Sequence, residues 1–371
     1  MSGTSKENNI AEKHNKGEWS EIYVLLYICG YGKMQVVNEH MEVHTSATQK
    51  IYKIYIDNDR KSRQEKMVIK IEKNDIVIFI DGMEIKTISR EWCREMAAIM
   101  FEEIKNGKGN SFSIDCAEEI KRELCLNNIK SPSLDKVDIT CELSDESMGF
   151  DSIVRYSVKS HLGNKATLLN SSGSTDVRFL IECKEQEIID KIRNSDQKQT
   201  VKQVTESIKH KDGSIKFVSV LNKTFRENLK IIDTIMPDIW GCMIKEYYID
   251  GISEIKNIAT KLEETDPLGL KQPNIYRIKI KKMLFAFAVG MIPSRRWNAQ
   301  AAVNGGIIMV RKKGQINVCT MNNVNRVENM LFNFTKFDSP SSGKVGCKRI
   351  YQVNGKNYIN LNPIIRFTNP D

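Results

Sequence analysis

The feature that most constrains the fold is the order of helix-like and strand-like hydrophobic patterns in the first 160 residues. Apolar residues at helical spacing predict an amphipathic helix that begins at Gly17, and Gly30 and Gly32 supply a stop. Strand-like segments follow at 50–56, 67–71 and 75–80, then a helical segment at 90–105, then two further strand-like segments, SLDKVDITCEL and IVRYSVKSHLG. This order predicts an α/β (mixed α+β) fold with a central mixed sheet flanked by helices.

The composition changes after residue 184. Residues 185–262 are rich in long polar and charged side chains and are expected to be largely helical, while the chain beyond residue 276 becomes β-rich, with hairpin turns predicted at Lys313–Gly314 and Asn354–Gly355. We therefore predict a disordered N-terminus over 1–15, a mixed α/β core over 16–184, and a second region over 185–371 made of a helical insert and a β-rich part. The last two could form one continuous domain.

Charge and motif content narrow the function. Lys plus Arg number 56 against 47 Asp plus Glu, a formal net charge of +9, which favours an anionic partner but also fits a solvated surface. No HExxH pair, no cysteine pair at metal-ligand spacing and no GxxxxGK[ST] loop is present, which argues against a zinc enzyme and against a nucleotide cofactor. The nine cysteines are expected to be mostly buried thiols.

No segment is predicted to cross or enter a membrane. The polar N-terminus has no apolar stretch of the signal-peptide kind, and the longest apolar run, 283–292, is too short to span a bilayer. We expect a cytoplasmic protein.

The candidate chemistry lies on the β-hairpin from Asp138 to Lys159. Phosphodiester hydrolysis with a hard metal needs oxygen ligands and a cation that orients the attacking water. Asp138 begins the first strand of the hairpin, and Ser157 and Lys159 share one face of the second because side chains alternate along a strand. The spacing has the form D-x(n)-(D/E)-x-K, with Ser157 in place of the second acid.

Serine is a poor magnesium ligand, so another donor is needed. Glu18 and Glu21 lie three residues apart on the first helix and are candidates. The backbone carbonyl of Val158 could fill a further position, and Asp151 in the hairpin turn is a rival carboxylate. The alternative reading is a half-buried structural hairpin with an exposed lysine.

Several segments together resemble the HpaII-like type II restriction endonucleases. These are GEWSEIYVLLYICGYGK, YSVKSHLGNKATLLNSSGSTDVRF, RWNAQAAVNGGIIMVRKKGQINV, FNFTKFDSPSS and IYQVNGKNYINLNPIIRF, in this order along the chain. The resemblance implies a PD-(D/E)xK-type nuclease core, Mg²⁺-dependent cleavage of double-stranded DNA and a short palindromic site, with CCGG the target of the namesake. It also implies that Asp138 is the acid, Lys159 the lysine and Glu21, rather than Glu18, the helix acid.

With this function, 16–184 is the predicted catalytic nuclease core and 185–371 the predicted DNA-recognition region. The residues predicted to contact DNA are different from the catalytic candidates. After the second strand we expect Ser160, Asn164, Lys165, Asn170 and Ser171 to hold the DNA backbone or enter a groove. In the C-terminal half, the candidates for phosphate or base contact are Arg295, Arg296, Asn298, Gln300, Lys336, Asp338, Ser341 and Lys344.

A palindromic target favours a homodimer during cleavage. Two other functions stay open at this point: a non-catalytic sequence-specific DNA-binding protein, and a repair or junction nuclease on the same core.

Overall fold

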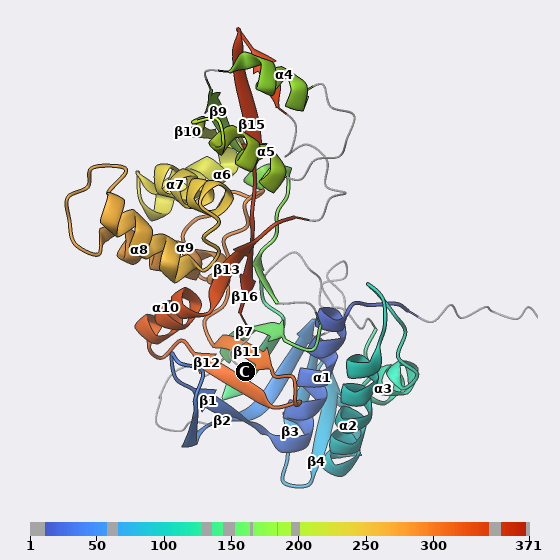
Figure 1. The fold of residues 1–371 in the computed structure, drawn as a ribbon. Coiled ribbons are helices and arrows are strands. Elements are labelled where there is room, and N and C mark those ends of the chain that lie inside the picture. Colours follow the sequence, from blue (N-terminus) through green and yellow to red (C-terminus); the bar gives the residue numbers. More distant parts are fainter. Residues whose placement is uncertain are drawn as a thin grey trace, which may run out of the picture. The chain divides into compact units, whose positions relative to one another are not determined.

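The computed structural model describes residues 12–57, 66–127, 136–143, 153–163, 166–183, 185–193, 201–340 and 350–368. By its internal contacts the chain forms two compact units (Figure 1). Unit 1 comprises residues 1–37, 42–166 and 303–320, and unit 2 comprises residues 38–41, 167–302 and 321–371. Unit 1 therefore takes up a segment, 303–320, that the sequence analysis assigned to the C-terminal recognition region.

Unit 1 is built on a nine-stranded mixed sheet. Its strands run β1-β12-β11-β7-β6-β2-β3-β4-β5, and β1 also pairs with the start of β2. The pairs β1–β12 and β7–β11 are parallel, and the other pairs in the sheet are antiparallel. The strands are β1 (Lys33–Val37), β2 (Val43–Asp57), β3 (Lys66–Ile71), β4 (Asp75–Ile80), β5 (Met83–Ser89), β6 (Ile139–Leu143), β7 (Ile153–Ser160), β11 (Gly306–Val310) and β12 (Ile316–Thr320).

Helix α1 (Lys16–Tyr31) begins at a capping box and ends at a glycine. The Asn15 side chain accepts hydrogen bonds from the first-turn amides, and Glu18 accepts one from the Asn15 amide at 3.0 Å. Gly32, with φ of 65°, donates its amide to the Ile28 carbonyl. Most of α1 is buried, including Trp19 and Leu26, so it is a core helix with few exposed positions rather than the amphipathic helix that its spacing suggested.

Helices α1, α2 (Arg90–Asn106) and α3 (Ala117–Glu123) complete the described helices of unit 1. The core that they form with the sheet contains Trp19, Met100, Tyr156, Val158 and Val310 among its buried side chains. Residues 12–15, which were predicted to be disordered, are also described: His14 pairs with Phe112, while 1–11 lie outside the described residues.

Unit 2 contains two small antiparallel sheets and a set of helices. One sheet has the order β10-β9-β15-β14 and the other β13-β16-β8. Its elements are β8 (Thr167–Leu169), β9 (Val177–Glu182), α4 (Gln186–Arg193), α5 (Val201–Lys209), β10 (Ser214–Val220), α6 (Lys223–Ile232), α7 (Met236–Ile249), α8 (Ile255–Thr265), α9 (Ile275–Val289), α10 (Val324–Asn333), β13 (Thr335–Asp338), β14 (Tyr351–Val353), β15 (Lys356–Leu361) and β16 (Ile364–Phe367). The expected helical region is thus interrupted by β10.

An aromatic cluster forms part of the core of unit 2. The Trp240 ring lies 6.1 Å from the rings of Phe225 and Phe287 and 5.5 Å from that of Phe337, each in an edge-on arrangement. These contacts join α6, α7, α9 and β13. None of the described helices is long and apolar enough to cross a membrane.

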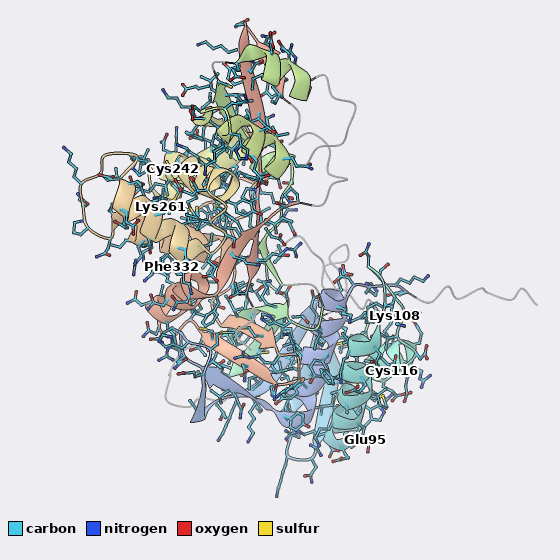
Figure 2. The ribbon with its side chains drawn as sticks, viewed as in Figure 1. Glu95, Lys108, Cys116, Cys242, Lys261 and Phe332 are labelled. Atoms are coloured by element: carbon cyan, nitrogen blue, oxygen red, sulfur yellow. The ribbon has the colours of Figure 1, made fainter. Side chains whose placement is uncertain are left out.

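The described cysteines are all free thiols, and Cys347 lies outside the described residues. Burial raises the pKa of Cys116 to about 12 and that of Cys242 to about 11 (Figure 2). Both thiols are therefore protonated at neutral pH.

Candidate active site

The predicted hairpin is present, and its register places Asp138 against Ser157. Strands β6 and β7 are antiparallel with Ile139 opposite Tyr156. One residue earlier, the Asp138 amide donates to the Tyr156 carbonyl at 2.9 Å, which extends the pairing to the residue before β6. The hairpin turn, including Asp151, lies outside the described residues.

The Asp138 carboxylate is held by the backbone and side chain of the opposite strand. Its Oδ2 accepts a hydrogen bond from the Val158 amide at 2.5 Å and one from the Ser157 hydroxyl at 3.2 Å. Charge-assisted bonds of this kind fix the side chain in one orientation. The second carboxylate oxygen remains for another ligand.

Lys159 is tied into the same arrangement through Ser157. Its Nζ donates to the Ser157 hydroxyl at 2.8 Å and to the Val158 carbonyl at 3.1 Å. Ser157 is buried and connects the ammonium group to the Asp138 carboxylate, accepting from one and donating to the other. The serine thus orients two functional groups in the position where the general motif has a second acid.

Lys136 is a site residue that the sequence analysis missed. Burial, and then the positive charge of Lys159, lower its pKa from 10.5 to about 8, while the Asp138 carboxylate acts in the opposite direction. Lys136 lies two residues before Asp138, at a bend in the segment that leads into β6, so strand alternation did not predict its place. The site therefore holds two lysines for one described aspartate.

The two glutamates of α1 have different environments. Glu18 belongs to the capping box of the helix and lies 3.6 Å from His14. Glu21 is half-buried and follows Ser20, whose hydroxyl lies 2.7 Å from that of Ser160 at the end of β7. Packing of α1 on β7 therefore brings the Glu21 region of the helix to the strand that carries Ser157 and Lys159.

Within the described part of the chain, no three His, Cys, Asp or Glu side chains form a cluster suited to a metal ion. The oxygens available at the hairpin are the Asp138 carboxylate and the Val158 carbonyl, both of which are hard donors. Magnesium commonly takes only one or two carboxylates and completes its shell with water and substrate phosphate. This donor set fits that pattern.

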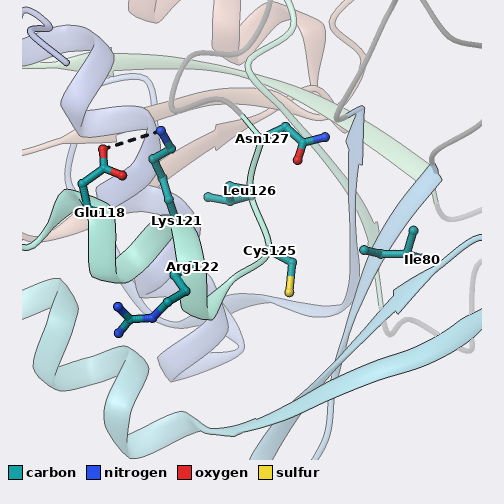
Figure 3. A pocket seen from close by; sticks show the side chains of 7 residues that line it. All are labelled: Ile80, Glu118, Lys121, Arg122, Cys125, Leu126 and Asn127. Atoms are coloured by element: carbon teal, nitrogen blue, oxygen red, sulfur yellow. Dashed lines mark ion pairs between the residues drawn. The ribbon is translucent and has the colours of Figure 1, made fainter. Parts of the chain in front are cut away.

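A pocket of about 450 Å³ lies elsewhere in unit 1, between α3 and β4 (Figure 3). Its described lining includes none of the predicted catalytic residues, and Lys121 within it is paired with Glu118 at 3.6 Å and with Glu12 at 2.9 Å. We assign it no part in the reaction.

The residues that were predicted to contact DNA after β7 lie in different environments. Ser160 and Ser171 are buried. Asn170 is exposed. Asn164 and Lys165 lie outside the described residues.

The predicted contacts near residue 295 lie on an exposed loop of unit 2. Arg295, Arg296 and Asn298 are exposed, and the Asn228 side chain anchors the loop by donating to the Arg295 carbonyl at 2.7 Å. Asn298 and Gln300 hydrogen-bond to each other. The loop is therefore ordered and presents its two arginines to solvent.

In the last predicted segment, β13 carries Lys336 and Asp338, both half-buried. Asp338 forms an ion pair with Arg366 at 2.8 Å, which gives this acid a structural partner. Ser341 and Lys344 lie outside the described residues.

A carboxylate and a backbone carbonyl can hold a hard metal ion, and a neighbouring ammonium group can stabilise negative charge on a phosphate. The arrangement at the hairpin is therefore suited to metal-assisted hydrolysis of a phosphodiester bond. Comparison with known proteins makes the class specific. The HpaII restriction endonuclease family model matches residues 15–367. The chain is 30% identical over 357 residues to the type II restriction enzyme HpaII of Haemophilus parainfluenzae, a match that covers 95% of this chain and 98% of that protein.

The chain therefore belongs to the HpaII restriction endonuclease family, and it is a type II site-specific deoxyribonuclease. The resemblance drawn from the sequence segments is confirmed. No solved structure matches the chain.

Proposed function

We propose that this enzyme hydrolyses double-stranded DNA in a Mg²⁺-dependent reaction at a short palindromic site that is, or contains, CCGG. The observation that carries the proposal is the hydrogen-bonded chain from Lys159 through Ser157 to Asp138. The family relationship supports DNA as the substrate, and the namesake of the family supplies the expectation for the target.

In the proposed site, Asp138 and Glu21 hold the metal, together with the Val158 carbonyl. Glu18 and Asp151 are the reserve candidates for the second carboxylate. Mg²⁺, when bound, supplies positive charge at the scissile phosphate and makes a bound water more acidic. The open oxygen of Asp138 is the one that would take part, because Oδ2 is engaged by Val158 and Ser157.

The side chains of Lys159, Ser157 and Lys136 have the remaining roles. Lys159 orients the attacking water and stabilises negative charge on the phosphate oxygens as it develops. Ser157 keeps the Lys159 ammonium group on the same side as Asp138, since its hydroxyl contacts both. Lys136 adds a second positive charge near the place where a phosphate would sit.

A palindromic target supports a homodimer during cleavage, with one active site for each strand. Cleavage of DNA requires that the enzyme has access to DNA in the cell, so we place it in the cytoplasm. We propose no nucleotide cofactor.

The test is digestion of a sequenced plasmid with Mg²⁺ or with EDTA, followed by mapping of the ends. We expect discrete bands with Mg²⁺, and Lys159→Ala should lower the cleavage rate by at least about 100-fold while DNA binding remains measurable. Lys105→Ala, an exposed lysine paired with Glu102 on α2, serves as the matched control. Full cleavage by Lys159→Ala would remove the hairpin from the mechanism, and ends at sequences unrelated to CCGG would refute the target.

A further inference from the structure

A basic and aromatic surface lies on one face of the four-stranded sheet of unit 2, in which β9, β10 and β15 run side by side (Figure 1). We call this the outer face and define it by Arg178, Lys216, Tyr351, Lys356, Tyr358 and Asn360. Side-chain alternation and register put these residues together: Asn360 is opposite Arg178, and Tyr351 is opposite Tyr358. None of the residues predicted from the sequence to contact DNA belongs to it.

The opposite face of the same sheet forms part of the core. Phe179, Ile215 and Ile359 are fully or almost fully buried there. Helix α7 packs closely on that side, because a Cβ at Gly241 would lie 2.2 Å from the ring of Phe217. The outer face is therefore the side of the sheet that points away from this core. Lys216 and Lys356 on it are exposed, and its other four defining residues are half-buried.

Arg178 is the central group of the outer face. Its guanidinium lies 5.6 Å from the centroid of the Tyr351 ring and 5.8 Å from that of Tyr358, and the two rings are stacked. Cation–π contacts of this kind hold a guanidinium in place without using its hydrogen-bond donors. The Tyr351 hydroxyl donates to the Asn360 Oδ1 at 2.7 Å, which orients the amide beside Arg178.

No ion pair joins the Arg178 guanidinium to an acid among the residues that the structure describes. Its Nε is buried without a hydrogen-bond acceptor, so only the two terminal nitrogens could reach an external acceptor. Two other arginines of unit 2 do have such partners: Arg193 pairs with Asp190 at 2.6 Å, and Arg366 with Asp338 at 2.8 Å. An arginine fixed by aromatic rings but left with open donors is suited to an external acceptor. The acid on the same face, Glu182, lies four residues along β9 and accepts from Ser214.

The outer face combines a hairpin with an arginine on the neighbouring strand. Strands β14 and β15 form a β-hairpin at the edge of the four-stranded sheet, and its turn has positive φ at Asn354 (50°) and Gly355 (75°). Arg178 lies on β9, next to β15, and in the major groove of duplex DNA a bidentate arginine on O6 and N7 of guanine is the most common specific contact. Lys216 and Lys356 add positive charge suited to the flanking phosphates.

We infer that the outer face contacts the DNA substrate in the major groove and that Arg178 reads a guanine of the recognition site. The inference rests on the proposed function, because that function supplies a duplex target containing guanine. Tyr351 and Tyr358 act as positioning residues that hold the guanidinium before DNA arrives, which reduces the entropy lost on binding.

The test compares binding of full-length variants to two duplexes by fluorescence anisotropy, with Ca²⁺ replacing Mg²⁺ to prevent cleavage. One duplex carries CCGG and the other carries the same bases in scrambled order. We expect Arg178→Ala to weaken binding to the CCGG duplex by about 10- to 100-fold and binding to the scrambled duplex by less than about 3-fold. Arg178→Lys should behave like Arg178→Ala, because lysine keeps the charge but loses the planar fork.

Arg226→Ala, on α6 and paired with Glu227, is the matched control and should bind both duplexes as the wild type does. Thermal unfolding of each variant shows that the fold is retained. Wild-type discrimination by Arg178→Ala overturns the inference. Equal weakening on both duplexes, with rescue by Arg178→Lys, also overturns it, because this pattern marks a phosphate contact.

Failure of the proposed function is separable from failure of this inference. A wild-type protein that binds the CCGG duplex specifically but does not cut DNA with Mg²⁺ refutes the proposed function and leaves the effect of Arg178 measurable. If end mapping gives a different site, the same comparison is made with that site.

Discussion

Replacing Lys136 with methionine should stabilise the metal-free enzyme at neutral pH and reduce its activity. Lys136 has a pKa of about 8 in the folded chain, against an ordinary value of 10.5, chiefly because burial disfavours the ammonium ion. The lysine must therefore be charged in an unfavourable place at pH 7. Methionine has similar length and no charge, so it removes this cost while keeping the packing.

The magnitude follows from the two pKa values. A separation between 10.5 and about 8 corresponds to about 3 kcal/mol, at about 1.4 kcal/mol for each tenfold change in proton affinity. Lys136 is only half-buried by its surface exposure, so solvent screening reduces the expected gain to about 1–2 kcal/mol.

The pH dependence has a definite sign. Between about pH 8 and 10.5 the unfolded chain binds more protons at this lysine than the folded chain does, so the free energy of unfolding contributed by Lys136 rises with pH. Below about pH 8 the full cost is present. The advantage of Lys136→Met should therefore be constant up to about pH 8 and disappear as the pH approaches 10.5.

The assay is urea unfolding in EDTA at pH 7 and pH 10, with Lys230→Met, an exposed lysine on α6, as the control. Equal stability of wild type and Lys136→Met at pH 7, or a gain at pH 10 as large as the gain at pH 7, would refute the reasoning. Cleavage by Lys136→Met should fall by about 10-fold or more, because the lost charge lies beside Asp138 and Lys159.

Three further predictions concern the site and the core. Glu21→Gln should lower the rate of DNA cleavage by at least about 100-fold. Glu18→Gln should keep a rate within a few-fold of the wild-type rate, because glutamine preserves the capping box; timed plasmid digestion measures both rates. Ser157→Ala should lower kcat by about 10-fold with little change in KM, since Lys159 and Asp138 lose their common partner; a substrate titration separates the two constants. Gly241→Ala should lower the free energy of unfolding, measured in urea, by about 1–3 kcal/mol because the added methyl group would overlap the ring of Phe217. Gly173→Ala has open space around it and should leave the free energy of unfolding unchanged.

Local patterns predicted the first helix, the strands β6 and β7, and the hairpin turns at Lys313–Gly314 and Asn354–Gly355. Helical spacing, turn glycines and alternation depend on near neighbours in sequence, and the observed elements α1, β6–β7, β11–β12 and β14–β15 follow from them. The same local information placed Asp138, Ser157 and Lys159 in one candidate site. The ordered family segments then gave the reaction class.

Local patterns could not predict other features, because these depend on packing between residues that are far apart in the chain. Strand β11 pairs in parallel with β7, which places Met309 beside Lys159 across about 150 residues of sequence, so no local signal assigned 303–320 to unit 1. Burial likewise decided that Ser160 and Ser171 are internal.

The sequence by itself determined the hairpin, its acid and lysine, and the family. Only the tertiary structure decided what surrounds them. It showed that Ser157 bridges the carboxylate and the ammonium group, that Lys136 joins them, and that Arg178 rests over two tyrosines with open donors. The physical reason is that hydrogen bonding, desolvation and ring contacts depend on distances between side chains, which a linear pattern does not contain.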